Sequence, residues 1–193
     1  MSEVVVGTPE QMRALGVRLA GLLRAGDLVL LVGDLGAGKT TLAAGIGAGL
    51  GVRGRVTSPT FVLAREHPGT GGGPALVHVD AYRLGGLAEL DDLDLESSVD
   101  DAVTLVEWGR GLAEDLATSR LEVVIERPRG AAADGTQAPD AEDAAPRHVT
   151  LRGIGPRWTN VDVAVEVGTH APGPAGLGTA GLGTAGLGTA GQP

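Results

Sequence analysis

The sequence contains no cysteine, and aromatic residues make up only 2% of its 193 residues. The absence of cysteine excludes disulfide bonds, thiolate chemistry and cysteine-ligated zinc. Because aromatics are so scarce, the 42% hydrophobic content predicts an aliphatic core of Leu, Val, Ile and Ala. The net charge of −9 argues against a broad nucleic-acid surface, since such a surface needs cations to displace counterions. A basic protein partner remains compatible with this charge.

Long hydrophobic runs are also missing. No apolar run approaches the roughly 20 residues that cross a bilayer. The first ten residues, MSEVVVGTPE, lack the basic and apolar regions of a signal peptide. We therefore predict a soluble, cytoplasmic protein. The length favours one compact domain, which we place at residues 1–153, followed by a C-terminal extension at residues 154–193.

Apolar periodicity predicts alternating strands and helices. Thr8 followed by Pro9 is typical of a helix start. Helices are expected from Pro9 to near Gly26, at Thr40–Leu50 and at Gly109–Ala117. Strands are expected at Val4–Val6, Asp27–Val32, Phe61–Glu66, Ala75–Val79, Val103–Glu107, Leu121–Glu126 and His148–Leu151, the last pairing antiparallel with Leu121–Glu126. The alternation predicts an α/β, three-layer domain with a mostly parallel central sheet.

Three segments are rich in small or polar residues. Residues 68–74 are glycine-rich and must form a loop. Residues 128–146 hold mainly Ala, Asp, Gly and Pro without apolar periodicity, which predicts a flexible loop. The sequence GLGTA occurs three times, beginning at Gly176, Gly181 and Gly186. A five-residue repeat of small side chains cannot bury an apolar face, so we predict a disordered, low-complexity tail.

A phosphate-binding motif lies directly between a predicted strand and a predicted helix. Residues 33–40, GDLGAGKT, satisfy the pattern G-x-x-x-x-G-K-[ST]. Glycines allow successive amides to turn onto phosphate oxygens, and the following helix directs its N-terminus at the same anion. Lys39 is the only lysine of the chain and can reach the β- and γ-phosphates, where we expect a catalytic role. The predicted nucleotide-binding residues are Asp34, Leu35, Gly36, Ala37, Gly38, Lys39, Thr40 and Thr41.

The bound nucleotide is expected to be ATP with Mg²⁺. The Thr40 hydroxyl is a candidate magnesium ligand. Asp80 and Glu107 each end a predicted strand, at the sheet edge where ligands of open α/β sheets bind. One of these acids can hold the metal while the other positions the attacking water, and spacing leaves that assignment open. Tyr82 and Trp108 lie beside these two acids, which favours a site role for both aromatic side chains.

Four sequence blocks, in this order, resemble a known family. They are GDLGAGKTT, VTSPTF at 56–61, HVDAYR at 78–83 and LVEW at 105–108. Together they resemble the bacterial tRNA threonylcarbamoyladenosine biosynthesis ATPase family, TsaE, over roughly residues 1–153. The resemblance implies a small P-loop ATPase that works with two partner proteins. That complex installs the threonylcarbamoyl group on adenosine 37 of tRNAs reading ANN codons, and tRNA is therefore an indirect partner. ATP turnover would reset the complex rather than transfer the group.

The resemblance also implies residue roles. Thr40 and Glu107 would ligate Mg²⁺, and Asp80 would support hydrolysis. A switch-like loop near the γ-phosphate would contain Thr57, Ser58, Pro59 and Thr60. Thr8 would flank the nucleotide, and Trp108 would follow the metal-binding acid. Two positions depart from the family pattern. Met12 stands where a hydroxyl is usual, and His67 stands where tyrosine is common.

Other functions remain open from the sequence. A small P-loop kinase is one, although the only arginine within the two long loops is Arg129. A GTPase is disfavoured because the only asparagine, Asn160, is not followed by the lysine of the guanine-binding motif. A nucleotide-gated scaffold with little turnover is a third. The acidic residues between Glu89 and Asp101 favour a solvated face over a metal cluster.

Overall fold

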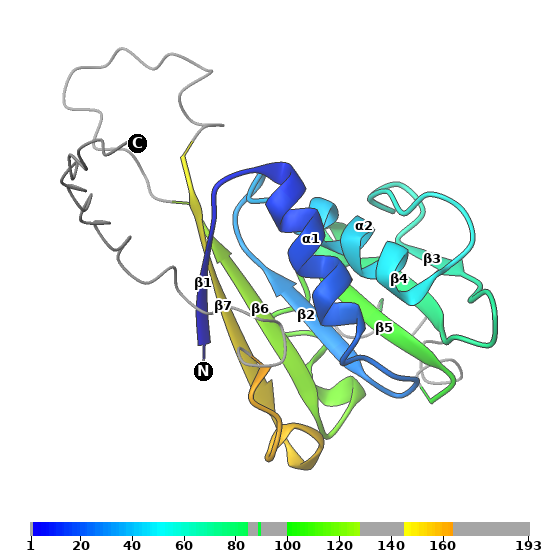
Figure 1. Ribbon diagram of the computed structural model, residues 1–193. Coiled ribbons are helices and arrows are strands. Elements are labelled where there is room, and N and C mark those ends of the chain that lie inside the picture. The colour runs from blue at the N-terminus through cyan, green and yellow to red at the C-terminus, as the bar shows by residue number, and fades with distance from the viewer. Residues whose placement is uncertain (1, 85–88, 90–99, 128–144, 164–193) are drawn as a thin grey trace, which may run out of the picture.

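The computed structural model describes residues 2–84, 89, 100–127 and 145–163. Within them the chain forms one mixed sheet with the strand order β1-β7-β6-β2-β5-β4-β3 (Figure 1). The strands are β1 (Ser2–Val6), β2 (Leu28–Val32), β3 (Ala64–His67), β4 (Ala75–Asp80), β5 (Ala102–Glu107), β6 (Arg120–Glu126) and β7 (Arg147–Ile154). The helices are α1 (Pro9–Ala20) and α2 (Lys39–Leu50), with short 3₁₀ turns at Ala81–Arg83, Glu114–Leu116 and Pro156–Trp158.

The centre of the sheet is parallel and its borders are antiparallel. Strands β6, β2, β5 and β4 run parallel to one another, whereas β7 pairs antiparallel with β6 and β1, and β3 pairs antiparallel with β4. The predicted pairing of the last strand with Leu121–Glu126 is confirmed. Leu28–Leu31 are all buried, as predicted for a central strand covered on both faces.

Both described α-helices cover the same face of the sheet (Figure 1). There the side chains of α1 and α2 form one aliphatic core with Val29 and Leu31 of β2. The opposite face, with Leu28 and Leu30, is covered by loop residues and the 3₁₀ turn at Glu114–Leu116. No second helical layer is found among the described residues. The α/β fold is therefore confirmed, and the third layer of the prediction is not.

Three segments do not form the helix or strand that was predicted for them. The segment Gly109–Ala117 forms turns instead of an α-helix, because Gly111 takes a left-handed φ of 81° that ends helical geometry. Phe61–Leu63 is a turn rather than strand: the amides of Val62 and Leu63 both donate to the Pro59 carbonyl, and Leu63 has φ 63°. Helix α1 ends at Ala20 instead of near Gly26.

The two helices approach each other unusually closely, and glycine permits it. A Cβ built on Gly16 would lie 2.5 Å from the Leu42 carbonyl oxygen, and one on Gly49 would lie 2.8 Å from the Val17 carbonyl oxygen. Any side chain at these positions would force the helices apart. The glycines of α2 thus hold that helix, and the loop before it, in a fixed position against α1.

The C-terminal part of the described chain packs on the sheet. Trp158 is 4% exposed and joins the core with Val163, and a Cβ on Gly153 would clash with the Trp158 side chain. The GLGTA tail, residues 128–144 of the predicted flexible loop and most of the acidic segment lie outside the described residues. None of the helices in the described part of the chain is long and apolar enough to cross a membrane.

Candidate nucleotide-binding site

The glycine loop connects β2 to α2 at the carboxyl edge of the parallel strands. Gly33, Gly36 and Gly38 have φ values of 156°, 74° and 110°, which side chains rarely allow. A Cβ on Gly33 would lie 2.5 Å from the Ile125 carbonyl oxygen. Helix α2 begins at Lys39 with Gly38 as N-cap, and no side chain caps its first amides. These amides and the helix dipole therefore suit an anion.

Lys39 lies buried beneath this loop, with 5% of its surface exposed. Its Nζ donates hydrogen bonds to the carbonyls of Gly33 (2.8 Å) and Asp34 (3.0 Å). It also lies 3.9 Å from the centre of the Trp108 ring, in cation–π contact. Burial lowers the pKa of Lys39, and the nearby carboxylates of Glu107, Asp80 and Asp34 oppose that shift. The ammonium group is therefore fixed next to the glycine loop, at the position expected for phosphate binding.

Thr40 and Glu107 face each other across the start of α2. Thr40 Oγ1 donates to the Glu107 carboxylate, 3.0 Å from Oε1 and 3.3 Å from Oε2. Glu107 is 3% exposed and also lies 3.0 Å from His78 Nε2, whose ring is fully buried. A hydroxyl and a carboxylate oxygen are ligands that Mg²⁺ prefers. The pair therefore fits the predicted metal-binding role.

Asp80 lies on the strand next to Glu107, because the register pairs these two residues directly. Its Oδ2 accepts hydrogen bonds from Thr60 Oγ1 (2.6 Å) and Ser58 Oγ (3.1 Å), and its Oδ1 accepts one from the Tyr82 amide (3.1 Å). Both oxygens are thus engaged by the 58–60 loop and the turn after β4. The two acids lie side by side, but only Asp80 is bonded to the loop.

The two predicted aromatic residues meet at the same place. The rings of Tyr82 and Trp108 are tilted, with centroids 5.1 Å apart. Trp108 has a left-handed φ of 62°, an unfavourable conformation for a bulky residue that occurs preferentially at functional sites. This backbone twist directly after β5 turns the indole back over Lys39.

These groups line one cavity of about 310 Å³. Its lining residues are Leu35, Gly36, Gly38, Lys39, Thr40, Thr41, Ser58, Thr60, Asp80, Tyr82, Glu107 and Trp108. Thr8 and Ala37 line an adjoining cavity of about 290 Å³, which shares Gly36, Gly38 and Thr41 with the first. Asp34 and Pro59 line neither cavity. Pro59 is buried, and its carbonyl holds the turn at 61–63.

The two departures from the family pattern have different consequences. Met12 is buried, and its side chain would lie 3.3 Å from a Cβ on Gly38, so it packs under the loop instead of hydrogen bonding. Thr8 still caps α1 by accepting from the Gln11 amide at 3.2 Å. His67 is buried in β3 and lines neither cavity.

Three further residues belong to the site although sequence reasoning did not assign them. His78 bonds Glu107, Arg127 Nη2 donates to the Gly36 carbonyl at 2.8 Å, and Arg147 lines the cavity beside Thr8. His78 lies two residues before Asp80 in β4, and alternate residues of a strand share one face. Strand alternation could therefore have indicated that His78 belongs to the site. Arg127 directly follows β6 and Arg147 begins β7. No local sequence pattern indicates that either arginine belongs to the site.

Within the described residues no group of three His, Cys, Asp or Glu side chains could hold a metal ion by itself. Mg²⁺ in nucleotide sites typically takes only one or two protein ligands, the rest being phosphate oxygens and water. Thr40 and Glu107 fit that arrangement.

A glycine loop between a buried strand and a helix, with acids at the ends of two neighbouring parallel strands, defines the class of P-loop nucleotide-binding proteins. Comparison with known families specifies the class further. The family model described as "Threonylcarbamoyl adenosine biosynthesis protein TsaE" matches residues 6–133. The chain belongs to the TsaE family, a family of P-loop ATPases.

Individual relatives agree with this assignment. The chain is 59% identical over 158 residues to the tRNA threonylcarbamoyladenosine biosynthesis protein TsaE of Streptomyces coelicolor, covering 81% of this chain and 100% of that relative. It is 54% identical over 125 residues to the protein of the same name from Mycobacterium tuberculosis, covering 61% and 74% respectively. The crystal structure of Bacillus subtilis YdiB is similar with a TM-score of 0.60 and 30% identity, covering 86% of this chain and 93% of that one.

Proposed function

We propose that this chain is a magnesium-dependent ATPase required for threonylcarbamoyl modification of adenosine 37 in tRNAs that read ANN codons. It acts on a complex of two partner proteins and does not transfer the group itself. Because the modification that it supports is made on tRNA, we place this work in the cytoplasm. The observation that carries the proposal is the convergence of Lys39, Thr40, Asp80 and Glu107 on one cavity.

The residues divide the chemistry as follows. Lys39 and the amides of the glycine loop grip the β- and γ-phosphates. Thr40 and Glu107 would hold Mg²⁺, which when bound would neutralise charge on the phosphate oxygens. The N–H of His78 fixes the Glu107 carboxylate from behind. Asp80 accepts a hydrogen bond from the attacking water and orients it. Thr8 and Met12 flank the nucleotide on the side of the second cavity.

The hydrogen bonds of Asp80 are the reason why we expect slow ATP turnover in the isolated chain. Both of its oxygens already accept bonds from Ser58, Thr60 or the Tyr82 amide. Oδ2 accepts bonds from both Ser58 and Thr60, so this oxygen must give up one of them before it can hold the attacking water. A movement of the 58–60 loop releases it; Pro59 of this loop is buried, whereas Ser58 and the flanking Thr57 and Phe61 are exposed. We propose that the partner complex causes this movement, so turnover is slow in the isolated chain.

Phosphate release with and without the two purified partner proteins tests this proposal. We expect slow release from the isolated chain and a clear increase when both partners are present. Binding of ATP with no release in either condition would instead support a nucleotide-gated scaffold. A phosphorylated small-molecule product would support a kinase.

Depletion of the protein in cells tests the biological part. Loss of threonylcarbamoyladenosine from tRNA is the expected result, measured by mass spectrometry of tRNA nucleosides. Restoration by the wild-type chain, but not by a Lys39→Ala variant, would tie the modification to nucleotide binding. An unchanged level of the modified nucleoside would refute the proposal.

A further inference from the structure

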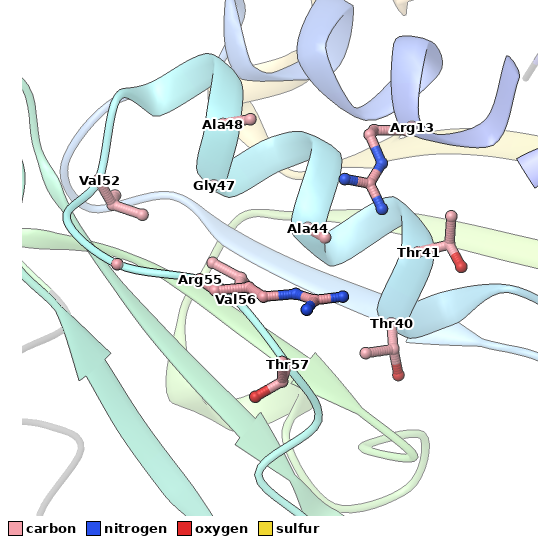
Figure 2. Close-up of a pocket in the computed structure, with 11 residues that line it drawn as sticks. Arg13, Thr40, Thr41, Ala44, Gly47, Ala48, Val52, Arg55, Val56 and Thr57 are labelled. Atoms are coloured by element: carbon pink, nitrogen blue, oxygen red, sulfur yellow. The ribbon is translucent and has the colours of Figure 1, made fainter. Parts of the chain in front are cut away.

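A third cavity, of about 480 Å³, lies beside α2 and is not used by the proposed chemistry (Figure 2). Its floor is formed by the small residues Ala44, Gly47 and Ala48 of α2. One wall is formed by Val52 and residues 54–57, and Arg13 of α1 closes the other side. We call it the α2 groove. It meets the nucleotide cavity at Thr40 and Thr41, and its other lining residues are separate from that cavity.

The α2 groove is cationic in an acidic protein. Figure 2 shows the guanidinium groups of Arg13 and Arg55 turned toward the first half of α2, with Ala44 between them. Both arginines are exposed, and neither side chain forms a hydrogen bond or ion pair with any described residue. No carboxylate lines the groove in the part of the chain that the structure describes. The exposed Glu10 of α1 is an electrostatic neighbour of Arg13 but does not line the groove. In a chain of net charge −9, two cations at one concavity indicate an acidic ligand.

Helix packing fixes both arginines in place. A Cβ on Gly45 would clash with the Arg13 carbonyl, so the backbone of Arg13 rests directly on α2. Arg55 is followed by Val56, which is 7% exposed and whose Cγ2 would lie 2.5 Å from a Cβ on Gly47. The two guanidinium groups therefore extend from firmly held backbone, which lowers the entropic cost of binding.

We propose that the α2 groove docks an acidic segment of a partner protein, with carboxylates paired to Arg13 and Arg55. Guanidinium groups bind carboxylates in a bidentate manner, and the small residues of the floor let a peptide backbone approach closely. A nucleic-acid backbone fits less well, because only two cations line the groove and the chain is acidic overall.

The position of the groove links docking to the nucleotide. Thr40 and Thr41 line both cavities, and Thr57 of the groove directly precedes Ser58, which bonds Asp80. A segment seated against Thr57 therefore contacts the loop that must release Asp80. This inference rests on the proposed function, since it names the surface by which the partner complex reaches that loop.

Charge reversal with a matched control tests the proposal. Arg13→Glu/Arg55→Glu is compared with Arg18→Glu/Arg53→Glu, which makes the same charge change on the same two elements at exposed positions outside the groove. Affinity for the purified partner pair is measured with ATP present, together with the ATP affinity of each isolated variant. We expect binding of the partner pair to weaken at least tenfold in the first variant and about twofold or less in the control. ATP affinity should stay within about twofold in both.

Each other outcome overturns the inference in a distinct way. Equal binding of both variants to the partners would refute the groove alone and leave the proposed function intact. No binding by the wild-type chain would refute the partner step of the proposed function, and the groove proposal with it. A loss of ATP affinity in the Arg13→Glu/Arg55→Glu variant would assign the groove to the nucleotide. Direct binding of purified tRNA that this variant alone loses would assign it to nucleic acid.

Cross-linking identifies the occupant. The chain lacks cysteine, so Ala48→Cys provides one thiol in the groove for a cysteine-directed photo-cross-linker. With the partner pair present we expect cross-links to a segment rich in Asp and Glu. Cross-links to a neutral or basic segment, or no cross-link from a variant that still binds the partners, would refute the proposal.

Discussion

The two halves of the nucleotide site differ in how firmly the fold holds them. The binding half, Gly33–Thr41 with Glu107, is built on β2, β5 and α2, and Lys39 and Glu107 are 5% and 3% exposed. The loop half, Ser58–Thr60 with Asp80 and Tyr82, is mostly irregular, and Phe61 beside it is 86% exposed. Regular structure thus preforms the part that we propose grips phosphate. The part that we propose orients water is held by a few side-chain hydrogen bonds, which a loop movement can break.

The largest effect is expected from the binding half. Lys39→Ala removes a buried ammonium that no other lysine can replace, and we expect ATP affinity to fall by about 100-fold or more. Calorimetric titration of ATP measures this, with the thermal midpoint of the variant without ATP as a control for folding. Unchanged affinity in a folded variant would mean that the glycine loop does not bind the nucleotide.

A change in the loop half should separate binding from turnover. Asp80→Ala removes the acid that orients water, while Lys39, Thr40 and Glu107 keep their places. We expect ATP affinity within a few-fold of wild type and turnover reduced by about 10²-fold or more. Normal turnover would move the catalytic role to Glu107 or elsewhere, and a loss of binding would show that the two halves are not separable.

A smaller effect is expected from the loop that holds Asp80. Thr60→Val keeps the shape of the side chain and removes the 2.6 Å hydrogen bond to Asp80 Oδ2. We expect kcat of the isolated chain to rise by about tenfold, with KM for ATP nearly constant, because Asp80 Oδ2 no longer has to give up this bond before it holds a water. Thr57→Val is the matched control, since Thr57 is exposed and has no described bond to Asp80. Equal kcat values for the two variants would contradict a positioning role for Thr60.

The smallest effect is expected from the tail. Removing residues 168–193 should leave ATP affinity and turnover within error of the full chain, because the GLGTA repeat has no side chains large enough to form a core. The same titration and phosphate-release measurements check this. A loss of ATP binding would show that the tail contributes to the site.

The binding half was predictable from sequence and the loop half was only partly so. A glycine pattern between an apolar strand and a helix has local signals, and the structure confirms the strand, the turn and the helix there. Strand ends also placed Asp80 and Glu107 at one edge, and their pairing in the register confirms it. The helix predicted at Gly109–Ala117 failed because apolar spacing does not reveal a left-handed glycine at 111.

The remaining site residues depend on tertiary contacts. Arg127 reaches the carbonyl of Gly36 from a distant strand end, and Arg13 lines a groove only because Gly45 lets α1 rest on α2. The phosphate-binding motif explains the glycines of the loop but not those of α2. In α2, the small space between the helices requires glycine. Such contacts have no local period for a sequence pattern to show.

The indole of Trp108 gives the protein a built-in optical reporter. Its ring lies 3.9 Å from the Lys39 ammonium, a neighbour that quenches or shifts indole emission by its charge. The other tryptophan, Trp158, is buried beside β7, which lies three places from β5 in the strand order. We expect its fluorescence to stay constant when the nucleotide binds. When the ammonium leaves the ring for a phosphate, intrinsic fluorescence will change without any added dye. Rapid mixing can therefore time nucleotide capture separately from the loop movement that we propose.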